Sequence, residues 1–227
     1  MRKILLTLCA FPEGHIMNDI FNNHIKPNFL YYANKHNFEF VVIDKDVVSP
    51  RHIHWAKFDW IKNNTSLKDG DIVTYIDSDS IIMNFDIDFV FDKNFSIPIE
   101  STGIMCMGFF SIKICDWSKC FIDKMINKEP ECNTFFNDND AFYKVLDLTF
   151  GDSFIGDENI NILPTEYNVT IFIDELIDKE DSLDQILSTC YKKEFYVPYE
   201  KIIIRHLAGK QIYKDYAKKY FNSNTVL

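Results

Sequence analysis

One segment, Ile72-Val73-Thr74-Tyr75-Ile76-Asp77-Ser78-Asp79-Ser80, constrains the fold more than any other part of the chain. Its first five residues form a short apolar run, which suits a central strand that is covered on both faces. Two carboxylates follow where this strand would leave the core, and a second apolar run, Ile81-Ile82-Met83, comes next. The simpler interpretation is a polar turn that only closes the strand. Such a turn rarely lies between two apolar runs, so the segment favours a strand that ends at a ligand site.

Segments typical of strands and of helices alternate along the rest of the chain. The expected strands are Lys3 to Cys9, Phe38 to Ile43, Ile72 to Ile76, Gly103 to Ile114 and Lys201 to Arg205. The expected helices are Met17 to His36 with a kink at Pro27, His54 to Leu67, Asp116 to Asn127, Asp138 to Leu146 and Gln211 to Phe221. This alternation predicts an α/β fold with a mostly parallel central sheet flanked by helices. Without a repeat or a linker rich in Pro, Gly or Ser, residues 1–227 are expected to form a single domain.

The composition excludes several other classes of protein. The formal net charge is −10 with no basic block, which argues against a nucleic-acid partner. No apolar run approaches the roughly 18 residues that a transmembrane helix needs, so no transmembrane segment is expected. The six cysteines contain no CxxC pair, and the first apolar run is too short for a convincing signal peptide. A cytoplasmic protein with reduced thiols is therefore expected.

The two carboxylates of Asp77 and Asp79 indicate a metal site. Hard divalent cations such as Mn²⁺ and Mg²⁺ prefer carboxylate oxygens and keep open positions for phosphates. The strand that ends in Asp77-Ser78-Asp79 resembles the DxD motif of GT-A glycosyltransferases. In that family the motif holds Mn²⁺ or Mg²⁺ against the diphosphate of a nucleotide-sugar donor. Upstream, Trp55-Ala56-Lys57 resembles the W-x-K element of several of these families, although Trp55 also suits a core position.

Three later segments extend the resemblance as far as Lys210. Ile204-Arg205-His206-Leu207-Ala208-Gly209-Lys210 is similar to the late His-x-x-Gly-x-Lys region of retaining members, except that Lys210 follows Gly209 directly. Asn137-Asp138-Asn139-Asp140-Ala141-Phe142 resembles the D-Q-D-A-L stretch of glycogenin-like and lipopolysaccharide galactosyltransferase families, with Asn139 in place of Gln. Leu163-Pro164-Thr165-Glu166-Tyr167-Asn168 is similar to their LPxxYN turn, and Met107-Gly108-Phe109-Phe110 to the strand whose glycine makes room for donor and acceptor.

The resemblance implies a metal-dependent glycosyltransferase that moves a sugar from a nucleotide-sugar donor, expected to be a UDP-sugar, to a glycan or another hydroxyl acceptor. It leans towards retention of the anomeric configuration. It assigns the metal, Mn²⁺ or Mg²⁺, to Asp77, Asp79 and His206. The residues that it assigns to the donor are Trp55, Lys57, Asp77, Ser78, Gly108, Gly209 and Lys210. Those that it places against the reacting sugar are Asp138, Asn139 and Asp140, although an acidic cluster that opens a helix is also good capping chemistry.

Two other functions are compatible with the same residues. A haloacid-dehalogenase-type phosphatase also begins its chemistry at a strand followed by DxDx[TV], here with Ile81 at the last position. Gly151-Asp152-Ser153-Phe154-Ile155-Gly156-Asp157 resembles the later acidic element of that family. The third hypothesis is a sugar- or nucleotide-binding module that keeps the fold but has lost turnover.

Overall fold

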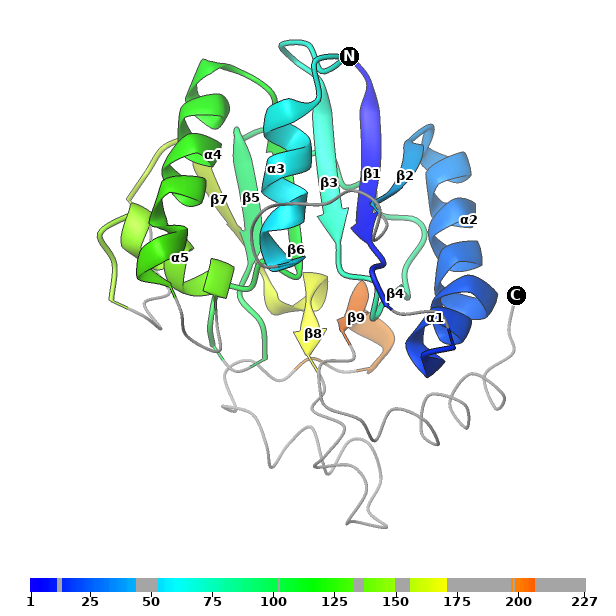
Figure 1. Ribbon diagram of the computed structural model, residues 1–227. Coiled ribbons are helices and arrows are strands. Elements are labelled where there is room, and N and C mark those ends of the chain that lie inside the picture. Colours follow the sequence, from blue (N-terminus) through cyan, green and yellow to red (C-terminus); the bar gives the residue numbers. More distant parts are fainter. Residues whose placement is uncertain are drawn as a thin grey trace.

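The structure is a computed structural model that describes residues 1–11, 14–43, 53–101, 103–132, 137–149, 156–170, 197 and 199–206 (Figure 1). The strands are β1 (Lys3–Leu8), β2 (Glu39–Ile43), β3 (Ile72–Ile76), β4 (Ser80–Ile82), β5 (Phe95–Pro98), β6 (Phe109–Lys113), β7 (Ile160–Leu163), β8 (Val169–Thr170) and β9 (Ile204–His206). The α-helices are α1 (Ile16–Ile20), α2 (Lys26–His36), α3 (Ala56–Asn63), α4 (Asp116–Lys128) and α5 (Asn137–Val145). A π-helix, Phe21–Ile25, joins α1 to α2, and short 3-10 helices lie at Ile53–Trp55, Glu129–Glu131, Thr165–Tyr167 and Tyr199–Lys201.

The larger sheet has six strands in the order β2-β1-β3-β6-β5-β7. The pairs β1–β2, β1–β3 and β5–β7 are parallel, whereas β6 is antiparallel to both of its neighbours, β3 and β5. The prediction of an α/β fold with a mostly parallel sheet is therefore confirmed. The reversed strand matters for the site, because it brings the start of β6 to the carboxyl end of β3.

Helices cover both faces of this sheet, and each face has its own apolar core. Ile4 and Leu6 of β1 point to one face, where they belong to a cluster with buried residues of α3, α4 and α5. Leu5 points to the other face and belongs to a cluster with α1, the π-helix and α2. In Figure 1, α3 and α4 lie across the face that is turned towards the viewer. Because side chains alternate along a strand, a continuous apolar run on β1 is what burial on both faces requires.

A second, three-stranded sheet has the order β4-β9-β8 and lies beyond the carboxyl end of β3. Strand β4 pairs antiparallel with β9, and this register places Ser80 opposite His206. Strand β8 pairs in parallel with β9, so that Thr170 also lies opposite His206. The small sheet thus brings a residue from late in the chain to the position that directly follows the acidic motif.

The expected helix from Met17 to His36 is present but is not uniform. Its middle, Phe21–Ile25, is a π-helix, and the N–H of Lys26 donates to the carbonyl of Phe21. Pro27, which lacks an N–H and crowds the carbonyl four residues earlier, follows at once and explains why the regular pattern is interrupted there. The helix ends at Asn37, which adopts the left-handed conformation (φ 57°).

Three other elements differ from the sequence-based prediction by more than one residue at a boundary. Helix α3 ends at Asn63 rather than at Leu67, because the Asn64 carboxamide accepts hydrogen bonds from the backbone and hydroxyl of Ser66 and forms a turn. The strand predicted to begin at Gly103 begins only at Phe109, and residues 103–108 form a loop in which Met105 makes an isolated antiparallel bridge with Ile99. The late strand is Ile204–His206 instead of Lys201 to Arg205. The predicted helix from Gln211 to Phe221 lies outside the described residues.

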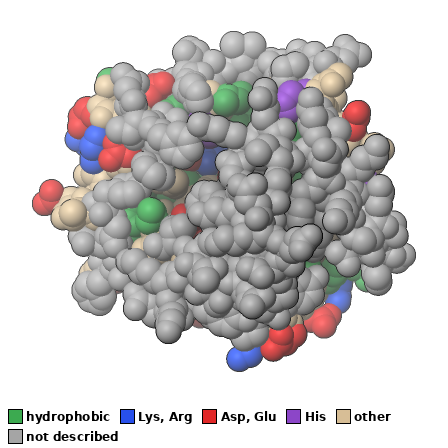
Figure 2. Space-filling model, turned by 90° about the horizontal axis from the view of Figure 1, so that it is seen from below, with side chains coloured by type: hydrophobic (Ala, Val, Ile, Leu, Met, Phe, Trp, Pro, Cys, Tyr) green, Lys and Arg blue, Asp and Glu red, His purple; other side chains and the backbone are tan. Residues whose placement is uncertain are grey.

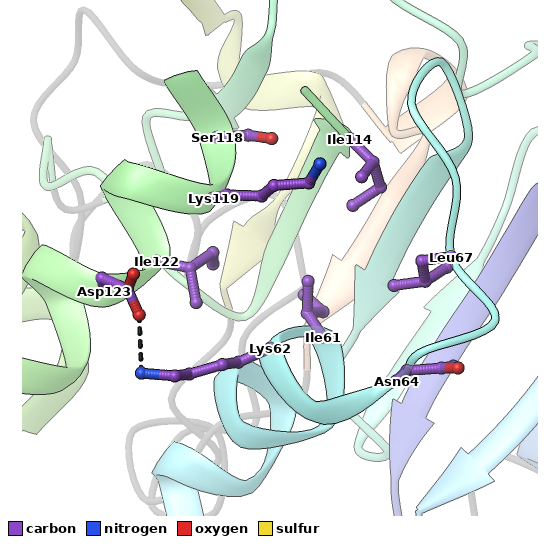
Figure 3. Close-up of a pocket in the computed structure, with 9 residues that line it drawn as sticks. All are labelled: Ile61, Lys62, Asn64, Leu67, Ile114, Ser118, Lys119, Ile122 and Asp123. Carbon is purple, nitrogen blue, oxygen red and sulfur yellow. Dashed lines mark ion pairs between the residues drawn. The ribbon is translucent and has the colours of Figure 1, made fainter. Parts of the chain in front are cut away.

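A cavity of about 380 Å³ lies between α3 and α4 (Figure 3). Ile61, Leu67, Ile114 and Ile122 supply its apolar lining, and the Lys62–Asp123 ion pair lies at its rim. Ile114 follows β6, whose end lies beside the start of β3, so this cavity is at the opposite end of the sheet from the acidic motif. It is therefore not the place where a ligand of Asp77 and Asp79 binds.

Two further observations concern the helices and the cysteines. Among the residues that the structure describes, no helix has both the length and the apolar character needed to cross a bilayer. Cys9, Cys106, Cys115, Cys120 and Cys132 form no disulfide with one another.

Asn28 is expected to be a main link between α2 and the small sheet. Its buried carboxamide donates to the carbonyl of Ile82 and accepts from the N–H of the same residue, both at 3.0 Å. Asn28→Ala leaves both backbone groups of β4 without these partners and should lower the free energy of unfolding by about 1–3 kcal/mol. Urea denaturation measures this change. Asn22→Ala, at an exposed site in the preceding helical segment, is the matched control, and an equal loss in both variants would contradict the assignment.

Candidate functional site

Asp77, Asp79 and His206 come together at the carboxyl end of β3. Nε2 of His206 lies 3.2 Å from Oδ1 of Asp79 and 3.7 Å from Oδ2 of Asp77. One ligand atom from each of the three residues lies within 4.8 Å of the other two. The sequence predicted these three residues as metal ligands, and the structure places them in one cluster. Figure 2 views the protein from the side of the carboxyl end of β3, where this cluster lies.

Gly108 forms the wall of this cluster. The N–H of Asp77 donates to the carbonyl of Gly108 at 2.8 Å, which continues the pairing of β3 with β6. A Cβ at position 108 would lie 2.8 Å from Cε1 of His206 and 2.9 Å from Oδ2 of Asp77. These distances are shorter than van der Waals contact, so the absence of a side chain at Gly108 is required for the two residues to approach each other.

The electrostatics of the cluster favour a cation. Burial alone would lower the pKa of His206, but the Asp79 carboxylate outweighs this effect and holds the pKa well above its ordinary value. The same carboxylates that stabilise a proton on the imidazole would stabilise a metal ion in its place. Two carboxylates and one imidazole form a donor set that suits Mn²⁺ and also accepts Mg²⁺.

Tyr75 connects the acidic motif to the core. Its hydroxyl donates to Oδ1 of Asp77 at 2.6 Å. Burial, reinforced by the negative charge of Asp77, raises the pKa of Tyr75 well above its ordinary value, so the phenol keeps its proton and remains a donor. Oδ1 of Asp77 is thus held by Tyr75, while Oδ2 is turned towards His206.

Lys57 and Asp138 form a buried ion pair next to Tyr75. Nζ of Lys57 lies 2.6 Å from Oδ2 of Asp138, and the two side chains are 3% and 8% exposed. The ammonium also donates to the carbonyl of Met107 at 3.0 Å and lies 4.5 Å from the centre of the Tyr75 ring. Burial disfavours the ammonium charge, but Asp138 and Asp77 outweigh burial and raise the pKa of Lys57 above its ordinary value. Lys57 therefore joins α3, α5 and the loop before β6.

The other two residues predicted on α5 have different partners. Asn139 accepts a hydrogen bond from the N–H of Met107 at 2.7 Å, next to Gly108. Asp140 pairs with Lys144 one helical turn later, at 2.9 Å, and its side chain is 16% exposed. Asp138 and Asn139 are thus fixed against the loop that carries Gly108, whereas Asp140 is held by Lys144 of the same helix.

The remaining predicted residues are less directly connected with the cluster. Trp55 is fully buried and packs against Phe58, with ring centres 5.9 Å apart, which fits a core role. Ser78 is buried between the two aspartates. Gly209 and Lys210 lie outside the described residues, so their predicted contacts with the donor stay predictions. The turn Leu163-Pro164-Thr165-Glu166-Tyr167-Asn168 forms the 3-10 helix that leads into β8, and the carbonyl of Glu166 accepts from the N–H of Ile203 at 2.8 Å.

Sequence reasoning missed two parts of the site. Tyr75 stands two residues before Asp77, and side chains two apart on a strand share a face, so this spacing could have identified it. Glu100 and Cys106, which lie on the other side of His206, have no such signal. They come from a loop whose path depends on the reversal of β6.

Solved structures with a similar fold are glycosyltransferases, and these likenesses support the GT-A fold that the sequence predicted. The structure resembles a glycosyltransferase involved in the glycosylation of the major capsid of PBCV-1 over 98% of this chain and 100% of the other, with a TM-score of 0.60 and 11% identity. It resembles the glycosyltransferase GlyE of Streptococcus pneumoniae TIGR4 over 96% of this chain and 60% of GlyE, with a TM-score of 0.54 and 14% identity.

A third similar structure is galactosyltransferase LgtC, solved in complex with donor and acceptor sugar analogs. The match covers 99% of this chain and 97% of LgtC, with a TM-score of 0.51 and 12% identity. No protein-family model matches the sequence, and no curated protein matches it significantly. At these identities the likenesses establish the fold alone.

The buried Lys57–Asp138 pair is expected to contribute strongly to the stability of the folded protein. Lys57→Met leaves the Asp138 carboxylate buried without its counter-charge and should lower the free energy of unfolding by about 3–5 kcal/mol. Chemical denaturation measures the loss. The matched control is Lys62→Met on the same helix, whose pair with Asp123 is about half exposed and is expected to contribute less than about 1 kcal/mol. Similar losses in the two variants would contradict the importance of the buried pair.

Proposed function

We propose that this protein is a metal-dependent glycosyltransferase that transfers a sugar from a nucleotide-sugar donor, a UDP-sugar, to a glycan or another hydroxyl acceptor. The observation that carries the proposal is the convergence of Asp77, Asp79 and Nε2 of His206 at the carboxyl end of a central strand in a GT-A fold. In open α/β sheets this end of the strands is where ligands bind. The likeness to LgtC, a galactosyltransferase whose structure holds donor and acceptor sugar analogs, supports the reaction class.

In this proposal Asp77, Asp79 and His206 hold a Mn²⁺ or Mg²⁺ ion. The bound ion would supply Lewis-acid stabilisation of the negative charge that develops on the departing nucleoside diphosphate. Tyr75 keeps the Asp77 carboxylate oriented through its 2.6 Å hydrogen bond. Gly108 leaves the space in which the imidazole and that carboxylate meet.

The residues of α5 serve the sugar in this proposal. Asp138, with Lys57 compensating its charge, and Asp140 stabilise positive charge at the anomeric carbon or orient the acceptor hydroxyl. Asn139 holds the start of α5 against the loop before β6, because its side-chain oxygen accepts a hydrogen bond from the N–H of Met107. The donor contacts expected of Trp55, Ser78, Gly209 and Lys210, the retention of configuration and the cytoplasmic location stay predictions.

Asp79→Asn should remove most of the metal-dependent activity while leaving the fold intact, because the amide oxygen that remains is a neutral ligand. The assay incubates a panel of nucleotide-sugars with the protein in Mn²⁺ or in EDTA and measures the release of nucleoside diphosphate. We expect release from one donor with Mn²⁺, little in EDTA, and a loss of at least about 100-fold in the variant. Asp123→Asn, on the exposed surface of α4, is the matched control.

Near-normal activity of Asp79→Asn would contradict the metal assignment. Hydrolysis of p-nitrophenyl phosphate with inhibition by beryllium fluoride, and no release from any nucleotide-sugar, would assign Asp77 and Asp79 to the phosphatase class. Donor binding without release would support a binding module that has no turnover.

Gly108→Ala should weaken Mn²⁺ binding even though it removes no ligand. The new methyl group would press on His206 and Asp77 at 2.8 and 2.9 Å, so both ligands must move apart. We expect the dissociation constant for Mn²⁺, measured by electron paramagnetic resonance of the free ion, to rise by about 10- to 100-fold. Gly156→Ala is the control, because a Cβ there meets no atom within 4 Å. Unchanged affinity in Gly108→Ala would show that the ion does not bind between Asp77 and His206.

A further inference from the structure

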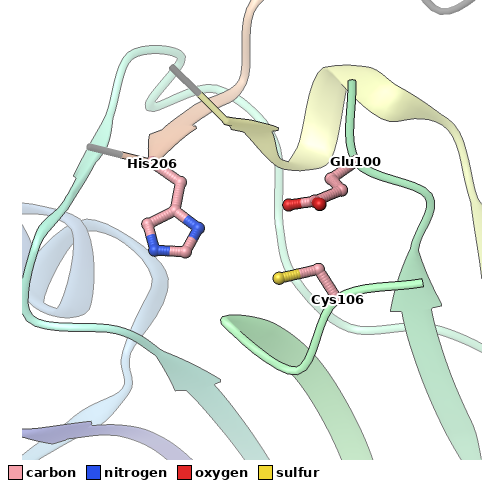
Figure 4. A group of neighbouring side chains, drawn as sticks. All are labelled: Glu100, Cys106 and His206. Carbon is pink, nitrogen blue, oxygen red and sulfur yellow. The ribbon is translucent and has the colours of Figure 1, made fainter. Parts of the chain in front are cut away.

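A second cluster of potential ligands lies on the other side of His206 (Figure 4). Glu100 follows β5, Cys106 precedes β6 and His206 ends β9. One carboxylate oxygen, the sulfur and one imidazole nitrogen lie within 4.8 Å of one another. The three side chains in Figure 4 point towards a common centre although they come from three separate parts of the chain.

The two nitrogens of His206 face different groups. Nε2 lies 3.2 Å from Asp79, within the cluster that the proposed function uses. Nδ1, on the side of Glu100 and Cys106, is buried and makes no regular hydrogen bond within the described part of the chain. The Cys106 thiol interacts with the ring, but its sulfur lies outside regular hydrogen-bond geometry. A buried ring nitrogen without a regular partner is costly unless something binds it.

Burial and charge also point to a cation at this place. Glu100, Cys106 and His206 are 9%, 6% and 7% exposed. A carboxylate, a thiolate and a neutral imidazole together carry two negative charges, which one divalent ion neutralises. Binding of the ion would therefore remove net charge from a buried group of ligands, which lowers the cost of burying them. Thr170, which donates to Oε2 of Glu100 at 2.6 Å, orients the carboxylate in the way that outer partners orient metal ligands.

We propose that Glu100, Cys106 and Nδ1 of His206 form a second cation site, which takes a thiophilic divalent ion such as Zn²⁺. Sulfur, nitrogen and oxygen ligands in a compact group are the usual donors of zinc, whereas Mn²⁺ and Mg²⁺ prefer oxygen. Binding releases two protons to solvent, one from the Cys106 thiol and one from Nδ1 of the His206 imidazolium, and a water molecule completes the tetrahedral set.

The two sites share one imidazole, so they are coupled. A neutral imidazole has one free lone pair, so an ion on Nδ1 leaves the ring proton on Nε2, and a second ion can bind Nε2 only if that proton is lost. Zinc should therefore weaken Mn²⁺ binding, and by linkage Mn²⁺ should weaken zinc binding to the same degree. This antagonism rests on the proposed function of Asp77 and Asp79, whereas the zinc site itself does not.

Co²⁺, a spectroscopic substitute for Zn²⁺, provides the test on the full-length protein. We expect wild-type protein to give the near-ultraviolet charge-transfer band of thiolate-bound cobalt. Cys106→Ser should abolish this band, and Asp79→Asn should retain it. The matched control is Cys120→Ser, an exposed cysteine, which should also retain the band. Absence of the band from wild-type protein, or its persistence in Cys106→Ser, overturns the proposal.

Circular dichroism tests whether each variant folds. If Cys106→Ser does not fold, Glu100→Gln serves as the second variant. Glu100→Gln keeps the shape of the side chain and should weaken cobalt binding by at least about tenfold. Unchanged cobalt affinity in Glu100→Gln would remove Glu100 from the site and overturn the proposal.

Competition between ions tests the coupling. Zn²⁺ also competes directly with Mn²⁺ at Asp77, Asp79 and His206, so the coupling is the additional effect: a given Zn²⁺ concentration should raise the dissociation constant for Mn²⁺ about tenfold more in wild-type protein than in Cys106→Ser. If Cys106→Ser by itself weakens Mn²⁺ binding as strongly as Asp79→Asn does, Cys106 only positions His206, and the separate site is overturned. If wild-type protein binds no Mn²⁺ but shows the cobalt band, the proposed function fails while the zinc site stands.

Discussion

The pairing of β4 with β9 is the constraint on which the candidate site depends. It places Ser80 opposite His206 and so brings an imidazole from late in the chain to the residue that follows the acidic motif. The antiparallel pairing of β3 with β6 completes the arrangement by placing Gly108 beside Asp77. A shift of one residue in either register would turn these side chains to the opposite face. The backbone hydrogen bonds of two sheets therefore determine the geometry of the cluster.

A network of buried charged and polar groups connects the acidic motif to α5. Lys57 lies between Asp138, the carbonyl of Met107 and the ring of Tyr75, and Tyr75 in turn donates to Asp77. Each member compensates a charge or a polar group that would be costly to bury alone. The proposed metal ligands and the proposed sugar-facing residues are thus parts of one network, which accounts for a lysine that is buried at the base of the site.

The sequence predicted those features that depend on local pattern. The apolar run before Asp77 identified β3, and the order of the motifs identified the fold and the cluster of Asp77, Asp79 and His206. The sequence did not predict which strands pair. The reversal of β6 has no signature in residues 109–112, which are all buried and mostly apolar because both faces of the strand are covered. The role of Lys57 was equally hidden, since whether a lysine meets a phosphate or a buried aspartate depends on how α3 packs against α5. Glu100 and Cys106 lie in a loop whose path tertiary contacts decide.

The central claim is that Asp77, Asp79 and His206 hold a divalent ion at the end of β3. A crystal structure of the protein grown with Mn²⁺ and UDP, with data collected near the manganese absorption edge, tests this most directly. We predict an anomalous peak bonded to carboxylate oxygens of Asp77 and Asp79 and to Nε2 of His206, with the diphosphate on its open side. A peak elsewhere, or a fully occupied UDP without a peak among these three residues, would contradict the claim.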